Sequence, residues 1–156
     1  MAESIENTNK EFPCFVADCS FMVAFLLGGY CSNEIYADDA AEKARYVLER
    51  NGQFYVPQVF WFEIENVLLL HSRKNRKGEI QLTADEVEEI RKDLSELPIY
   101  TDLQPDAETR SRIGVYAREY NLSYYDASYL ELARRYNLKL CTFDADLKAA
   151  YEACVE

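Results

Sequence analysis

Short apolar runs alternate along this chain with longer segments whose apolar residues recur at helical spacing. Runs of the first kind are typical of buried strands, and spacing of the second kind is typical of amphipathic helices. The predicted strands are residues 15–17, 53–56, 98–101 and 139–142. The predicted helices are residues 21–27, 38–50, 58–77, 105–120, 123–136 and 144–153, with one more that opens at 83.

Polar residues between these segments provide the helix starts and stops. Ser20 is placed to cap the helix at 21–27, and Asp38 and Asp39 are placed to cap the next one. The helix at 58–77 is expected to end in a basic run, which complements the negative end of its dipole.

The order of the elements predicts the fold class. One strand followed by two helices occurs three times, and a strand and a helix close the chain. Helical crossovers imply parallel strands, so we expect an α/β domain of three layers, α/β/α, with a central parallel sheet of four or five strands. This single domain should span residues 13–156, after a flexible N-terminal tail at 1–12.

Four acidic residues stand where such a sheet would gather them. Asp18 and Asp144 directly follow the first and last apolar runs, and ligands of parallel sheets bind beyond the carboxyl ends of strands. Glu63 lies on the apolar stripe of its helix, and Asp126 shares an inner helix face with Tyr129. Four buried carboxylates repel one another, and a divalent cation removes that cost. Mg²⁺ or Mn²⁺ prefers oxygen ligands and suits phosphodiester hydrolysis.

Each acid also has an ordinary structural interpretation. Asp18 and Asp144 can cap the helices that follow them, and Asp126 completes a capping-box pattern with Ser123. Glu63 can lie at the edge of its stripe and reach solvent. The expected convergence of all four acids on one edge of the sheet favours the metal site.

Two hydroxyl residues flank the candidate acids. Ser20 follows Asp18 by two residues, and Thr142 precedes Asp144 by two. Hydroxyls at such places orient a carboxylate or a metal-bound water. A helix cap and a β-branched strand end explain the same two residues equally well.

The charge balance limits how this chain can bind nucleic acid. Its net charge is −11 and its sequence pI is about 4.6, which argues against a broad basic binding face. A nuclease is still compatible, because metal ions supply local positive charge, and a basic partner protein also fits. The one basic run, at residues 73–77, either contacts phosphates or is a solvated helix end.

Several other classes of protein are disfavoured. Five cysteines without a CxxC pair predict reduced thiols in a cytoplasmic protein. The longest apolar stretch is far shorter than the ~20 residues of a membrane span, and the polar N-terminus does not resemble a signal peptide. The single histidine, His71, has no context for a catalytic triad, and phosphate-loop, dinucleotide and zinc patterns are absent from the sequence.

Two further α/β classes with acids at strand ends fit less well. A haloacid-dehalogenase-like phosphatase requires Asp-x-Asp after the first strand, where this chain has Asp18, Cys19 and Ser20. A receiver-like domain requires adjacent acids there and a lysine at a later strand end, whereas Lys139 precedes its strand.

Four motifs in succession resemble those of PIN domains, most closely the compact VapC-type toxins of toxin–antitoxin pairs. They are VADCS at 16–20, FEIEN at 62–66, YDASYLELA at 125–133 and CTFDADL at 141–147. Each is short, but four in order at suitable separations are fairly specific. The likeness covers nearly the whole chain after the tail.

This resemblance implies an endoribonuclease that depends on Mg²⁺ or Mn²⁺. The matching positions are Asp18, Glu63, Asp126 and Asp144 for metal binding and catalysis, with Ser20, Asn66, Thr142 and Asp146 in support. It also implies an RNA substrate, a homodimer, and an antitoxin whose basic tail covers the acidic site. A catalytically weak PIN-like module that binds RNA or protein, and a nuclease of structured DNA, stay open as alternatives.

Overall fold

The central sheet has four parallel strands. A computed structural model describes residues 13–30 and 34–155, and the tail expected at 1–12 lies outside them. The strands are β1 (Cys14–Ala17), β2 (Gln53–Val56), β3 (Ile99–Thr101) and β4 (Lys139–Cys141). They are ordered β3-β2-β1-β4, and every neighbouring pair is parallel. The predicted order of elements is confirmed.

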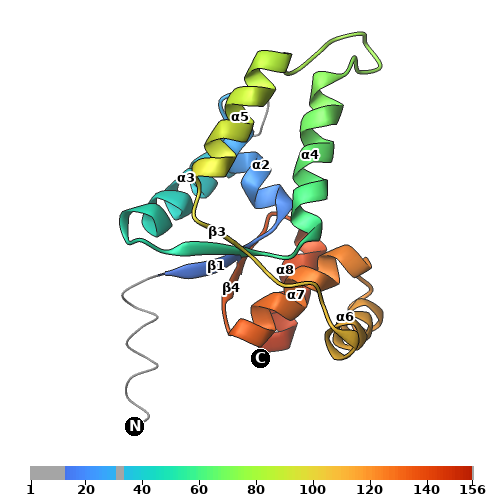
Figure 1. Cartoon of the computed structure of the whole chain (residues 1–156). Helices are drawn as coiled ribbons and strands as arrows, with labels where there is room; N and C mark the ends of the chain where they lie inside the picture. The colour runs from blue at the N-terminus through green and yellow to red at the C-terminus, as the bar shows by residue number, and fades with distance from the viewer. Residues whose placement is uncertain (1–12, 31–33, 156) are drawn as a thin grey trace.

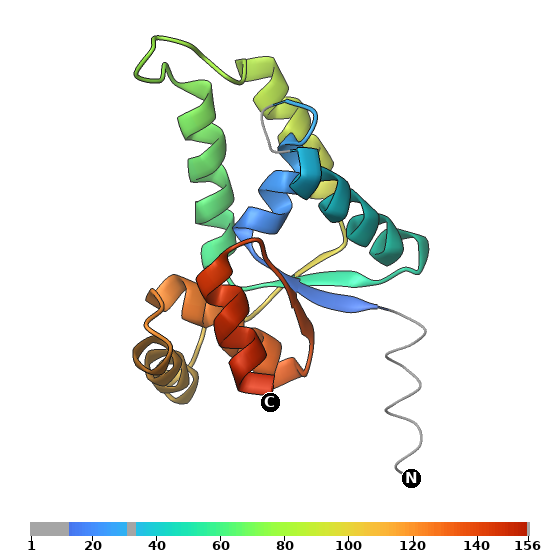
Figure 2. The ribbon, with the colours of Figure 1, turned by 180° about the vertical axis from the view of Figure 1, so that it is seen from behind.

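Helices flank this sheet on both sides, as Figure 1 shows. One side carries α2 (Cys19–Leu27), α3 (Glu34–Glu49), α4 (Val59–Ser72) and α5 (Ala84–Glu96). The other side carries α6 (Ala107–Glu119), α7 (Tyr124–Tyr136) and α8 (Ala145–Val155). Figure 2 shows the same division from behind. The predicted α/β class with three layers is confirmed.

The strand order reverses between β1 and β4. The chain adds β1, β2 and β3 in one direction, and then crosses through α6 and α7 to place β4 on the other side of β1. In open α/β sheets, the crevice at the carboxyl ends of two such strands is the usual place for a ligand. The fold therefore directs attention to the residues that follow β1 and β4.

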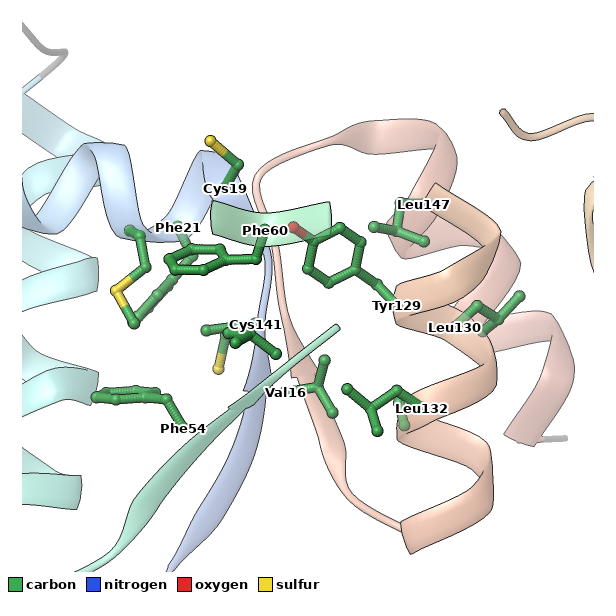
Figure 3. Packing of buried hydrophobic residues seen from close by; sticks show 14 of the residues in the cluster. Val16, Cys19, Phe21, Phe54, Phe60, Tyr129, Leu130, Leu132, Cys141 and Leu147 are labelled. Atoms are coloured by element: carbon green, nitrogen blue, oxygen red, sulfur yellow. The ribbon is translucent and has the colours of Figure 1, made fainter. Parts of the chain in front are cut away.

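The main core lies between the sheet and its helices. Val16, Phe54 and Val56 are fully buried because helices cover both faces of their strands. Tyr129 of α7 is fully buried as well, and Figure 3 shows its ring extending toward the segment that carries Phe60, at the start of α4. This large side chain therefore bridges the two helical layers.

A smaller core holds α4 and α5 together as a hairpin that projects from the sheet (Figures 1 and 2). Its buried residues are Leu27, Leu68, Leu82, Val87 and Ile90. The connection between the two helices, residues 73–83, lies at the end of the hairpin that is remote from the sheet.

The predicted cap of the first helix is wrong. α2 begins at Cys19, and Asp18 is its cap, since the Asp18 side chain accepts a hydrogen bond from the Phe21 amide. Ser20 therefore lies in the first turn. Asp and Ser are comparable caps, and the first of them after β1 has the extended backbone that a cap requires.

The predicted start of the second helix is also wrong. α3 begins at Glu34, so Asp38 and Asp39 lie within the helix. Asp39 forms a salt bridge with Lys43 one turn later, with 3.0 Å between Oδ2 and Nζ. Pairs at this spacing support a continuous helix, so the acids do not mark its start.

The long helix ends earlier than predicted, at Ser72 rather than at 77. Arg73 has an extended backbone, and the side chain of Asn75 accepts hydrogen bonds from the amides of Lys77 and Glu79. Such a side-chain turn competes with the helix. The basic run is therefore part of the connection between α4 and α5.

Membrane and disulfide features are not found in the part of the chain that the structure describes. None of its helices has the length and apolar character needed to cross a bilayer. Cys19, Cys141 and Cys154 are free thiols, and Cys31 lies outside the described residues.

Gly52 lies where the chain enters β2, and its position leaves no room for a side chain. A Cβ there would stand 1.8 Å from the carbonyl oxygen of Pro13. We expect Gly52→Ala to lower the free energy of unfolding by about 2 kcal/mol, because the two backbone segments must move apart. Urea denaturation followed by circular dichroism measures this change.

Gly114→Ala is the matched control. Gly114 lies inside α6, and its nearest contact for a new Cβ is Arg118 Nη1 at 4.0 Å. Alanine should stabilise this helix by about 1 kcal/mol. A Gly52→Ala protein as stable as wild type would contradict the close approach of Pro13.

Candidate functional site

Asp18 directly follows β1 and is 5% exposed. Its Oδ1 accepts hydrogen bonds from the Ser20 hydroxyl at 2.7 Å and from the Phe21 amide at 2.9 Å. Its Oδ2 accepts one from the Thr142 hydroxyl. The carboxylate is therefore held by the start of α2 on one side and by the residue after β4 on the other.

The same two hydroxyls also accept bonds from the turn between β4 and α8. The Phe143 amide donates to Ser20 Oγ at 2.9 Å, and the Asp144 amide donates to Thr142 Oγ1 at 3.0 Å. Side chains as well as the sheet therefore join the ends of β1 and β4. This junction places Asp144 at the same edge of the sheet as Asp18.

Glu63 is half-buried on α4 and accepts a hydrogen bond from the Tyr129 hydroxyl, 3.0 Å from Oε1. Figure 3 shows the Tyr129 ring projecting from α7 with its oxygen turned toward α4. Burial raises the pKa of Glu63, the bond from Tyr129 opposes that rise, and the charges of Asp126 and Asp18 add to it. Burial also holds the pKa of Tyr129 well above its usual range, so the phenol remains a donor.

Asp126 lies half-buried in the first turn of α7, which Ser123 caps by accepting a bond from the Asp126 amide at 3.0 Å. Burial raises the pKa of Asp126, the Ser123 hydroxyl lowers it, and the charges of Asp144 and Asp146 raise it again. Asp144 and Asp146 are exposed at the start of α8, where Asp144 Oδ1 accepts a bond from the Leu147 amide at 2.8 Å.

Electrostatic effects connect the four candidate acids through Asp126. The charge of Asp126 raises the pKa of Asp18 and of Glu63, and the charge of Asp144 raises the pKa of Asp126. Burial is the largest cause of the raised pKa at Asp18, Glu63 and Asp126. The structure thus brings the four acids into one region at the carboxyl edge of the sheet.

None of these four carboxylates forms a salt bridge with a cation in the described residues. Glu131 offers the contrast, because it is 2% exposed and forms salt bridges with both Arg112 and Arg135. Asp18 is comparably buried but has only hydroxyl and amide donors around it. A buried carboxylate without a cationic neighbour is destabilising, and such groups are typical of functional sites.

The carboxylates match a divalent cation in their chemistry, because Mg²⁺ and Mn²⁺ prefer oxygen ligands and bind carboxylates readily. Within the described residues, 13–30 and 34–155, no three acidic, histidine or cysteine side chains lie close enough together to hold an ion directly. Mg²⁺ commonly binds one or two carboxylates and keeps several of its waters. The arrangement therefore suits an open site, in which waters complete the coordination, rather than a closed cage.

A comparison with protein families decides the classification. The family model described as the PIN domain matches residues 18–153, from the first candidate acid almost to the end of α8. The chain belongs to the PIN domain family. PIN domains are generally nucleases. No functionally curated protein matches the sequence.

Solved structures show the same fold. This PIN domain is similar to the protein PAE2754 of Pyrobaculum aerophilum, with 22% identity and a TM-score of 0.60 over 90% of this chain and 85% of that one. It is also similar to VapC20 of Mycobacterium tuberculosis, a toxin that cleaves the sarcin–ricin loop. That match has 16% identity and a TM-score of 0.58, and it covers 88% of this chain and 94% of the other.

Two of the predicted supporting residues form no hydrogen bond with a candidate acid in the described residues. Asn66 is exposed on α4, and none of the hydrogen bonds in the described residues joins it to an acid. Asp146 is exposed and acts on Asp126 through its charge. The bond from Tyr129 to Glu63 was not predicted from the sequence, because helical spacing places Tyr129 on an inner face but does not identify its partner on another helix.

Removing the Tyr129 hydroxyl of this PIN domain should change the titration of Glu63. The hydrogen bond favours the charged carboxylate, so its loss in Tyr129→Phe should raise the pKa of Glu63 further. Carboxyl-detected NMR titration measures this shift in metal-free protein. Tyr151→Phe is the control, because the Tyr151 hydroxyl donates its hydrogen bond to the Leu138 carbonyl and not to Glu63. An unchanged titration of Glu63 in Tyr129→Phe would contradict the hydrogen bond between Tyr129 and Glu63.

Proposed function

We propose that this PIN domain is an endoribonuclease that depends on Mg²⁺ or Mn²⁺ and acts as the toxin of a toxin–antitoxin pair. The observation that carries the proposal is the nearly complete burial of Asp18, which has no cationic partner among the described residues and lies beside carboxylates that raise one another's pKa. A cation at this edge would offset their repulsion. The PIN family and the VapC-like fold support the same reaction.

The proposed mechanism gives each acid a role at the carboxyl edge of the sheet. Asp18, Asp126 and Asp144 would hold the ion directly or through water, and Glu63 would bind it or position the attacking water. The ion, when bound, activates water and stabilises charge on the phosphate. Ser20 and Thr142 orient Asp18, while Tyr129 orients Glu63. Asp146 adds negative charge beside Asp126.

Two alternative functions are separated by the substrate and by metal removal. A nuclease of structured DNA would cleave flap DNA in preference to single-stranded RNA. A catalytically weak module that binds RNA or protein would show no cleavage that EDTA abolishes. Cleavage of RNA that stops in EDTA and returns with Mn²⁺ favours the endoribonuclease.

The proposed protein partner is an antitoxin that binds next to the acids. The outer face of α4 exposes Phe62, Leu69 and Leu70, and Phe62 is 80% exposed beside Glu63. Large apolar side chains that are exposed together on one helix are typical of a protein interface. An apolar antitoxin segment on this face, followed by a basic tail, would meet both the exposed side chains and the acidic site.

Two further proposals concern assembly and cellular location. We propose a homodimer, for which light scattering of the purified protein should give twice the mass of one chain. We also propose a cytoplasmic location, which fits the free thiols of Cys19, Cys141 and Cys154.

Replacing Asp18 by Asn should reduce RNA cleavage by about a hundredfold or more, because it removes the buried charge while keeping the shape. Asn should also retain the helix cap, so the fold is expected to survive. Cleavage of total RNA with Mg²⁺ or Mn²⁺, followed by mapping of the new ends, measures the loss.

Asp93→Asn is the matched control for this loss. Asp93 is exposed on α5, and its substitution changes the net charge equally, so cleavage should stay at the wild-type rate. An Asp18→Asn protein that is folded and cleaves RNA as fast as this control would overturn the proposed site.

Mn²⁺ should raise the melting temperature of the metal-free protein, and more so at neutral pH than at about pH 5. The raised pKa values of Asp18, Glu63 and Asp126 mean that folding favours their protonated forms. Their contribution to stability is therefore lost as pH rises through the raised values. The cation binds the charged forms, so protons compete with it at low pH.

Differential scanning fluorimetry of wild type and Asp126→Asn measures this effect. Mn²⁺ should raise the melting temperature of the variant by less than that of wild type. Asp126 interacts electrostatically with each of the other three acids, because its charge raises the pKa of Asp18 and Glu63 and the charge of Asp144 raises its pKa. An increase that is equal in both proteins would place the bound ion elsewhere.

A further inference from the structure

The connection between α4 and α5 concentrates positive charge on an otherwise acidic protein. Residues 73–77, here called the basic loop, contain four of the 17 Lys and Arg residues of a chain whose net charge is −11. The four basic residues are exposed: Arg73, Lys74, Arg76 and Lys77. No other five-residue stretch of the sequence holds as many.

The cations of the basic loop have no acidic partner in the described residues, unlike Arg91 and Arg135. Arg91 forms salt bridges with Glu65 and Glu88, and Arg135 pairs with Glu131. Across residues 13–30 and 34–155, no salt bridge includes a residue of the basic loop. The positive charge of the loop is therefore available to an external anion.

Internal hydrogen bonds give the basic loop a defined shape. Asn75 Oδ1 accepts bonds from the amides of Lys77 and Glu79 at 2.9 and 3.0 Å. The Asn75 amide donates to the Glu79 carbonyl at 2.8 Å, and Gly78 adopts a φ of 78° that glycine tolerates. Beyond the turn, buried Leu82 anchors the chain to the smaller core. The cations are thus displayed on an ordered turn.

The basic loop and the acidic site lie toward opposite ends of α4. Glu63 is near the start of the helix, and Arg73 follows its last residue. About ten helical residues span about 15 Å. Figures 1 and 2 show the loop at the outer end of the hairpin and the start of α4 close to the sheet. With about 3.4 Å per nucleotide in a stacked strand, four or five nucleotides would cover that length.

We infer that the basic loop binds phosphates of single-stranded RNA several nucleotides away from the bond that is cleaved. This inference rests on the proposed ribonuclease function. The acidic edge binds a polyanion only where a cation neutralises it, and that cation acts on the reacting phosphate alone. The loop supplies the second contact that a long RNA needs, and a short RNA cannot reach it.

The first test measures binding of an unstructured, fluorescein-labelled RNA of about 20 nucleotides in an Asp18→Asn background, so that the probe stays intact. The loop variants are Arg73→Gln/Lys74→Gln and Arg76→Gln/Lys77→Gln. Each should raise Kd by about tenfold at low salt and reduce the slope of log Kd against log salt by about 1.4, since each phosphate contact contributes about 0.7. Fluorescence anisotropy at several salt concentrations gives both quantities.

The control variant removes two charges from elsewhere. Arg134 and Lys139 are exposed, lie at the end of α7 and the start of β4, and form no salt bridge in the described residues. Both lie away from the carboxyl edge that carries Asp144. Arg134→Gln/Lys139→Gln should keep the wild-type salt slope. Equal slopes for the control and for both loop variants would overturn the inference.

The second test uses length. With RNA of about two nucleotides, which spans only about 7 Å, a strand held at the acidic site ends before the loop. The loop variants and the control should therefore bind it alike. If the loop variants raised Kd for this short RNA as much as for the long one, the separate contact would be rejected. The loop would then act only through its general charge.

Failure of the proposed function gives a different result. If wild type cleaves no RNA with Mg²⁺ or Mn²⁺, the ribonuclease proposal fails, while a loop-dependent salt slope would still establish the RNA contact. If wild type cleaves RNA but both loop variants keep its KM and its salt slope, the loop inference alone is overturned. Circular dichroism confirms that each variant is folded before either comparison.

Discussion

The structure depends on the burial of one carboxylate at the junction of two strands. Asp18 caps α2, accepts a hydrogen bond from the hydroxyl of the residue after β4, and is nearly inaccessible to water. These roles hold β1, α2 and β4 together, but the donors are neutral and leave the charge uncompensated. Glu131 shows that the same fold can pair a buried acid with two arginines. The difference between these two acids separates a structural ion pair from a group available for chemistry.

Most of the architecture was accessible from the pattern of residues. The strands are short and apolar, and their alternation with helix pairs permits few topologies, so the parallel sheet followed from spacing alone. The errors lie at helix ends near Ser20, Asp38 and Ser72. At each of these places two local arrangements have similar energy, and tertiary contacts or a side-chain turn decide between them.

The site was predicted in part for a related reason. Strand ends and helix faces constrain where Asp18, Glu63, Asp126 and Asp144 can lie, so their proximity could be anticipated. The bond from Tyr129 to Glu63 crosses between helical layers, and periodicity within one helix carries no information about such a partner. Asn66 was given a supporting role by the family resemblance, which does not show whether its side chain reaches the acids, and it is exposed on α4.

The uninterrupted course of α4 has a consequence for insertions and deletions. A single added residue would lengthen the helix by about 1.5 Å and rotate everything beyond it by about 100°. Such a rotation would remove Ile64 or Leu68 from the core, depending on where the residue was added. Related chains should therefore differ in this helix by nearly whole turns, whereas the connection at 73–83 can vary in length without this restriction.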